Sequence, residues 1–134
     1  MKKMKKIGII NSEISRVISE LGHTDRIVIA DAGLPIPPQV KRIDLALKKG
    51  IPSFIETVET VLMEMCVAKA YVAEEMGSAS ATKREELIAL LPGVQIQVIT
   101  HEELKALTHQ AKAVIRTGEF TPFANVILEA GVIF

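Results

Sequence analysis

Hydrophobic positions in this chain switch repeatedly between helical spacing and short β-branched runs. Apolar residues recur every three or four positions over 14–21, directly after Asn11, and this predicts an amphipathic helix with a polar N-cap. Gly22 follows and suits a helix C-cap. Residues 26–30 (RIVIA) are continuous, apolar and β-branched, which favours a buried strand. The first 30 residues therefore predict a helix followed by a strand.

The same spacing arguments apply to the rest of the chain. Residues 31–38 contain three prolines and a glycine, so they are expected to be irregular. Helices are expected where a capping pair precedes an apolar face, as at Ser53/Glu56, Thr82/Glu85 and Thr100/Glu103. The predicted helices cover 53–66, 82–91 and 101–111, and the further predicted strands cover 43–47, 70–73, 94–99, 113–117 and 126–128.

Helices that alternate with buried strands indicate a layered α/β domain. The last two strands are separated by too few residues for a helical crossover, so we expect a mixed rather than wholly parallel sheet. A length of 134 residues suits one domain, residues 1–134, with a sizeable core.

Composition narrows the classes of partner. The chain is 49% hydrophobic and 24% charged, which excludes a disordered protein. Sixteen basic residues balance sixteen acidic ones, and there are four Phe, one Tyr and no Trp; nucleic acid is therefore not an expected partner. No apolar stretch has the length of a membrane span, and the lysine-rich start precedes too short an apolar run for a signal peptide. We expect a cytoplasmic protein with a small, neutral partner.

The reactive side chains offer few familiar motifs. Cys66 stands alone, and a reduced thiol packed in the core is favoured over a nucleophile. The histidines are isolated from other ligand types, so no metal site is expected, and His109 lies in a polar stretch that indicates the surface. Phosphate-binding glycine loops and serine-centred elbows are absent from the sequence.

Three polar clusters lie at the ends of predicted elements, where chemistry in α/β proteins gathers. They are GHTDRIVIADAG with His23 and Asp31, ITHEE with His101, and the loop 116–125. Imidazole, carboxylate and amide groups together suit a ligand with many hydroxyls. From the residues alone, a polar pocket containing histidine is predicted.

Each cluster also has a purely structural interpretation. His23 could bond the last carbonyls of its helix, and Asp31 could bond its own backbone in a turn. His101 could simply begin a helix, where the helix dipole favours a neutral imidazole. Arg116 and Glu119 are expected to pair with each other rather than with a ligand.

Long motifs throughout the chain resemble the D-ribose pyranase family of sugar mutarotases. They include residues 8–12 (GIINS), 21–25 (LGHTD), 27–35 (IVIADAGLP), 43–45 (IDL), 100–103 (THEE) and 111–122 (AKAVIRTGEFTP). Residues 67–93 carry little of the resemblance. The related fucose mutarotases are less similar to this chain through residues 116–122 (RTGEFTP). The resemblance implies a three-layer α/β/α domain with a central mixed sheet.

The resemblance also implies an activity and an assembly. It implies a cofactor-independent isomerase that interconverts pyranose and furanose forms of D-ribose in ribose catabolism. It further implies a homodecamer of two stacked pentameric rings, with sugar bound near subunit boundaries. The almost uncharged C-terminal run 126–134 independently predicts burial against a neighbouring copy.

By the resemblance, His23 is the catalytic acid. The substrate-binding residues it implies are Asp31, His101, Phe123, Ala124 and Asn125. The family commonly carries a tyrosine where this chain has Phe123, so one hydroxyl contact to the sugar is missing. His101 is our candidate for the base that takes the anomeric proton. The alternatives are a non-catalytic sugar-binding or regulatory module, a mutarotase for a related sugar such as fucose, and a purely structural ring-forming protein.

Overall fold

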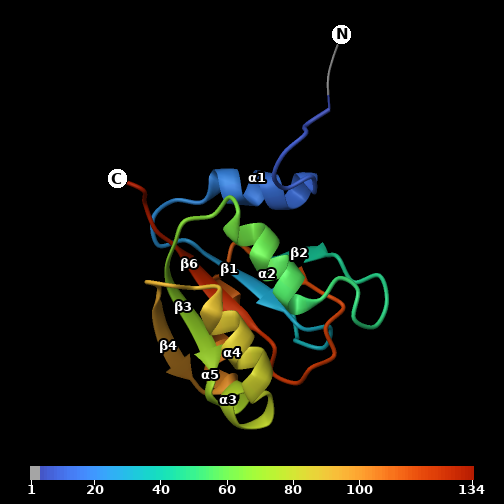
Figure 1. Cartoon of the computed structure of the whole chain (residues 1–134), viewed down its shortest axis with the longest axis vertical. Helices are drawn as coiled ribbons and strands as arrows, with labels where there is room; N and C mark the ends of the chain where they lie inside the picture. Colours follow the sequence, from blue (N-terminus) through green and yellow to red (C-terminus); the bar gives the residue numbers. More distant parts are fainter. Residues whose placement is uncertain (1–3) are drawn as a thin grey trace.

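The computed structural model describes residues 4–134. Within these residues six strands form one sheet in the order β2-β5-β1-β6-β3-β4 (Figure 1). Their bounds are β1 Arg26–Ala30, β2 Lys41–Asp44, β3 Val67–Ala73, β4 Gln95–Ile99, β5 Ala113–Arg116 and β6 Val126–Ala130.

Strand β6 makes the sheet mixed. β1 pairs with β5 in parallel, with Ile29 opposite Ile115, and with β6 in antiparallel fashion, with Ile29 opposite Val126. β6 is also antiparallel to β3, whereas β2 and β4 run parallel to their neighbours β5 and β3. The carboxyl ends of the other five described strands therefore meet the start of β6 at one edge. The predicted mixed sheet is confirmed, although β1 lies between β5 and β6.

Helices cover both faces of the sheet. The described helices are α1 Ser12–Glu20, α2 Phe54–Leu62, α3 Glu74–Ala79, α4 Ala81–Ala89 and α5 His101–Leu107, followed by a 3-10 turn, η1, at Thr108–Gln110. Phe54 of α2 and Leu87 of α4 pack with Ile27 and Ile29 on one face. Leu104 of α5 packs with Val28 on the other. This arrangement confirms the three-layer α/β/α fold.

The helix starts follow the capping chemistry of the sequence. Asn11 accepts a hydrogen bond from the backbone N–H of Ile14 at 2.9 Å, and Ser53 does the same for Glu56 at 3.1 Å. Thr100 and Glu103 form a complete reciprocal capping box at the start of α5. These contacts satisfy N–H groups that a helix leaves unpaired at its first turn.

Several element boundaries differ from the prediction. β2 covers 41–44 rather than 43–47: the N–H of Leu45 makes the last backbone bond to Arg116 of β5, and the N–H of Ala46 bonds instead to the side chain of Asp44. α2 ends at Leu62 rather than at 66, and η1 replaces the last turn predicted for α5. α4 begins after Ser80, without a side-chain cap, so the predicted cap at Thr82 is wrong.

Two further predictions need correction. The short helix α3 was not expected; the fully buried side chain of Met76 anchors it despite Gly77 and Ser78. Cys66 is exposed rather than packed in the core, since Met65 occupies the buried position beside it. Gly22 lies outside the left-handed region, and the helix before it ends with the N–H of Leu21 bonded to Ile18. In the described part of the chain, no helix is long and apolar enough to cross a membrane.

Candidate active site

The candidate site lies at the edge where the parallel strands end and β6 begins. Asp31 directly follows β1, and Asn125 directly precedes β6. His101 comes two residues after the end of β4, behind Thr100, which is the N-cap of α5. Ligand sites of open α/β sheets commonly form at the carboxyl ends of strands. Three of the residues that the sequence placed in separate clusters are thus brought to one edge.

Asp31 and Asn125 are joined by two hydrogen bonds. The Asn125 side-chain oxygen accepts the backbone N–H of Asp31 at 2.8 Å, and its Nδ2 donates to Oδ2 of Asp31 at 3.2 Å. Asn125 is fully buried, so this pairing satisfies an amide that would otherwise be costly to bury. In this structure Asn125 holds Asp31 in place, a role that the sequence did not predict.

The Asp31 carboxylate is fixed on its other side by the turn that follows it. Its Oδ1 accepts the backbone N–H of Gly33 at 3.0 Å, as the structural interpretation of Asp-Ala-Gly expected. Burial raises the pKa of Asp31 above its ordinary value, and the hydrogen bonds from Gly33 and Asn125 and the nearby His101 only partly oppose this. The site therefore holds a carboxylate that takes up a proton more readily than an exposed aspartate.

Asp31, His101 and Phe123 line one cavity of about 260 Å³, together with Gly33, Leu34, Pro35 and Pro122. The ring of Phe123 packs edge-to-face against His101, with centroids 5.0 Å apart and an interplanar angle of 80°. Phe123 has a φ of 61°, which is uncommon for an aromatic residue. Ala124, beside it, is fully buried in the core. The cavity thus combines polar groups with one apolar wall.

The two ring nitrogens of His101, which lines this cavity, differ in their surroundings. Its Nδ1 is buried and has no hydrogen-bond partner among the described residues. That leaves Nε2 as the atom able to meet a ligand.

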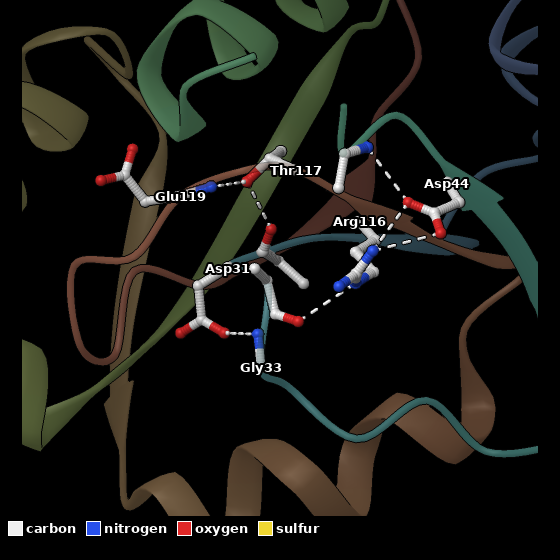
Figure 2. A network of polar contacts seen from close by, with 9 residues as sticks. Asp31, Gly33, Asp44, Arg116, Thr117 and Glu119 are labelled. Atoms are coloured by element: carbon white, nitrogen blue, oxygen red, sulfur yellow. Dashed lines mark hydrogen bonds and ion pairs between the residues drawn. The ribbon is translucent and has the colours of Figure 1, made fainter. Parts of the chain in front are cut away.

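A second cavity, of about 410 Å³, adjoins the first through Asp31, Gly33 and Pro122. Arg116 lines it, and the guanidinium is held from two sides (Figure 2). Nε donates to the carbonyl of Ala32 at 3.1 Å, and one terminal nitrogen donates to both carboxylate oxygens of Asp44 at 3.1 and 3.2 Å. The expected pair between Arg116 and Glu119 is therefore wrong, because β5 places Asp44 of β2 directly opposite Arg116.

Glu119 instead braces the loop that forms the cavity walls. Its carboxylate accepts the N–H of Phe54 at 2.9 Å and the hydroxyl of Thr121 at 2.6 Å, while its backbone oxygen accepts the N–H of Ala32 at 2.8 Å. Burial alone would raise the pKa of Glu119, but these hydrogen bonds and the charge of Lys83 lower it overall. Glu119 is thus a buried group that braces the loop, a role that the expected pairing with Arg116 did not anticipate.

The loop also approaches the neighbouring backbone closely at Gly118. A Cβ at this position would lie 2.5 Å from the carbonyl oxygen of Lys48 and 2.6 Å from that of Ile51, so only glycine fits. Thr117 holds the start of the loop to the end of β1 by donating its hydroxyl to the carbonyl of Ala30 at 2.8 Å (Figure 2). The polar residues of 116–125 thus mainly shape the loop, and few of them remain free for a ligand.

His23 lies at the opposite end of the sheet from these residues. It is exposed and precedes β1, whereas Asp31 follows β1. The next residue, Thr24, bonds through its N–H to Ala130 at the end of β6. The five residues of β1 alone span about 16 Å at a rise of about 3.3 Å per residue. Within one chain, His23 and the Asp31 cavity are therefore separate.

The third histidine, His109, lies on the surface away from the candidate site. His109 is exposed and pairs with Gln39 at 3.1 Å, in agreement with the surface position expected for it. Over residues 4–134, no three His, Cys, Asp or Glu side chains come close enough together to hold a metal ion.

Comparison with known proteins finds relatives that match nearly the whole chain. It is 55% identical to the D-ribose pyranase of Chloroflexus aggregans over 98% of this chain and all of that protein. The structure of Bacillus subtilis RbsD complexed with D-ribose matches with a TM-score of 0.95 and 51% identity, over 98% of this chain and all of that one.

More distant structures share the fold alone. The fucose mutarotase of Streptococcus pneumoniae, solved in complex with L-fucose, matches with a TM-score of 0.72 and 22% identity, over 93% of this chain and 95% of that one. The model of the RbsD / FucU transport protein family matches residues 4–133. On this full-length match and the identities above, the chain belongs to the RbsD / FucU family.

Proposed function

We propose that this protein is a D-ribose pyranase, an isomerase that interconverts the pyranose and furanose forms of D-ribose. Its full-length relatives of that name and the similar ribose-bound structure support this activity. The observation that carries the proposal is the single cavity in which Asp31, held by Asn125, meets His101 and Phe123. Hydrogen-bonding groups of both kinds beside an apolar ring suit a sugar, which presents both hydroxyls and C–H groups.

The reaction needs only proton transfers at three oxygen atoms: the ring oxygen, the anomeric oxygen and the hydroxyl that forms the new ring. When the bond between C1 and the ring oxygen breaks, the ring oxygen gains a proton and the anomeric hydroxyl loses one. The open-chain aldehyde then closes through a different hydroxyl, which loses its proton while the aldehyde oxygen gains one. General acid–base help of this kind typically contributes about 10²–10⁴ in rate, which suffices because the exchange already proceeds in water.

The chain offers candidates for each task. His23 is the proposed acid at the ring oxygen, since an imidazole can give and take protons near neutral pH. His101 is the proposed base, and Nε2 is the atom that would accept the anomeric proton because Nδ1 is buried. Asp31 accepts hydrogen bonds from the sugar hydroxyls, and Phe123 forms the wall beside them, whereas Ala124 and Asn125 are buried and support that wall from behind.

His23 can serve this site only from a neighbouring copy of the chain. It lies beyond the far end of β1 from Asp31, so we place the His23 of one subunit at the cavity of the next. The exposed C-terminal Ile133 and Phe134 follow β6 at that same end and provide an apolar contact surface. A homodecamer of two pentameric rings, built from single-domain subunits of residues 1–134, would bring these parts together.

Exchange spectroscopy by NMR tests the activity directly. Magnetisation transfer between the pyranose and furanose signals of D-ribose is measured without protein, with protein, and with an equal concentration of an unrelated protein. Faster exchange with this protein alone is the expected result. Binding of ribose without faster exchange would indicate a sugar-binding module, and neither binding nor exchange would indicate a structural protein.

A further inference from the structure

The first turn of α5 receives a carboxylate from a distant part of the chain. Glu75, the second residue of α3, accepts the backbone N–H of His101 on its Oε1 at 2.9 Å. His101 is the first residue of α5, and its N–H has no partner within the helix itself. The capping box of Thr100 and Glu103 serves other N–H groups of the same turn.

The body of α5 is held by other contacts. Leu104 is fully buried and packs in the same cluster as Ala73 and Ile99, at the ends of β3 and β4. The position of the helix as a whole therefore does not depend on Glu75. What Glu75 fixes is the residue at the helix start, whose ring contacts Phe123 and lines the cavity of Asp31.

The topology explains why Glu75 is the residue that reaches this point. β3 and β4 are parallel, with Ala73 opposite Ile99, so the segments that follow them begin side by side. Glu74 and Glu75 are the first and second residues after the end of β3, but Glu74 is exposed and Glu75 is half-buried. The chain thus offers a neighbouring glutamate as a natural control.

We propose that Glu75 is a positioning residue for the sugar site, which acts by holding the backbone of His101 so that Nε2 faces the substrate. This inference rests on the proposed pyranase function. A displacement of a reacting group by about 1 Å can cost up to about a hundredfold in rate, so loss of this bond is expected to slow exchange on the order of tenfold.

Two substitutions of similar length separate the hydrogen bond from the size of the side chain. Glu75→Gln keeps an oxygen that can accept the N–H of His101, and it should exchange ribose within about twofold of the unmodified protein. Glu75→Met has no such oxygen and should show the loss of on the order of tenfold. Glu74→Met serves as the matched control and should leave exchange unchanged.

A double-mutant cycle shows whether Glu75 acts through His101. In a His101→Ala background, Glu75→Met should cost less than about twofold further, because the ring that it positions is gone. An equal loss with and without the imidazole would overturn the proposal and indicate a general structural effect. Normal exchange by Glu75→Met would also overturn it, whereas no acceleration by the unmodified protein would refute the proposed function itself.

Hydrogen exchange tests the contact even if Glu75→Met does not fold. In the unmodified protein, the His101 amide should exchange more slowly than the Glu102 amide of the same turn, because only the former is bonded to Glu75. Equal exchange of the two amides would contradict the proposal.

Discussion

Asn125 and Asp31, which are 94 positions apart in the sequence, share two hydrogen bonds beside the cavity that Asp31 lines. The amide is fully buried, whereas the carboxylate borders the cavity. Any ligand that Asp31 binds therefore depends on a residue behind it. This relationship makes Asn125 a support of the site that acts through Asp31.

Asn125→Ala should weaken both the site and the fold. The substitution leaves the N–H of Asp31 without its partner, which costs about 1–3 kcal/mol in the free energy of unfolding. Ribose affinity should fall as well, because the Asp31 carboxylate is released. Chemical denaturation and calorimetric titration measure the two effects, and an Asn125→Ala variant that binds ribose like the unmodified protein would show that this loop does not form the site.

The sequence predicted the elements that local chemistry controls. The buried run 26–30 became β1 without a change of boundary, and the capping box at Thr100 and Glu103 formed as expected. α3 was missed because Gly77 and Ser78 lower its helix propensity, while Met76 is held by tertiary packing that no local pattern records.

The candidate site was only partly predictable for the same reason. The turn at Asp31 involves Gly33, two residues away, and was anticipated. The partners of Arg116 and Glu119 are Asp44 and Phe54, which sequence proximity does not suggest. Strand register decides the first pair and the packing of α2 decides the second. The separation of His23 from Asp31 likewise appears only once β1 lies between them.

Mixing two inactive variants should restore activity if the site is shared between copies. His23→Ala and Asp31→Ala should each abolish accelerated exchange while keeping fold and assembly. After mixing by joint refolding, about a quarter of the sites should combine an intact His23 from one chain with an intact Asp31 from another. The exchange rate measured by NMR should recover accordingly.

The control for this experiment is the double variant that carries both substitutions in one chain. Refolded alone under the same conditions, it should stay inactive. Full activity of folded His23→Ala would remove this residue from the mechanism. Two inactive variants that remain inactive after verified mixing would contradict the shared site.

Ribose binding should depend on pH through Asp31. Burial raises the pKa of this carboxyl above its ordinary value of 3.8, so the carboxylate is lost at a higher pH than for an exposed aspartate. Affinity should fall as the pH is lowered through that raised pKa, since the protonated group accepts hydrogen bonds poorly. Titrations between about pH 7 and about pH 4 would show the step, and Asp31→Asn should lack it.

The protonation of Asp31 should not unfold the protein, so a loss of ribose affinity at low pH is not expected to come from unfolding through this group. Because the pKa of Asp31 is higher in the folded than in the unfolded chain, this group favours folding increasingly as the pH falls through the folded pKa. A thermal melt at each pH distinguishes the two effects. An affinity that is constant over this range, in a protein that stays folded, would contradict a ligand contact by the carboxylate.

The protein should be an oligomer whose contacts include its C-terminal residues. The side chains of Ile133 and Phe134 are 90% and 101% exposed in the single chain, and such residues favour burial against a neighbour. Light scattering at micromolar concentration should give a mass several times that of one chain. Ile133→Asp should lower it, whereas Met4→Asp, the same kind of change at an exposed apolar residue near the other terminus, serves as a control. A monomer mass for the unmodified protein would defeat the prediction.

Phe123→Tyr should tighten ribose binding modestly. The ring of Phe123 stands against His101 in the wall of the cavity, so an added hydroxyl can reach either the sugar or a site group. One neutral hydrogen bond is worth about 0.5–1.5 kcal/mol net, or roughly two- to twelvefold in affinity. This gain should be smaller than the loss caused by Asn125→Ala, which also disturbs Asp31.

Phe120→Tyr is the matched control, because this ring lies on the same loop but lines only the adjoining cavity and is 60% exposed. Calorimetry on the two tyrosine variants should show tighter binding for position 123 alone. Equal gains at both positions would mean that the effect is not specific to the wall beside His101. Unchanged or weaker binding by Phe123→Tyr would show that the space in front of this ring is not where the sugar hydroxyls lie.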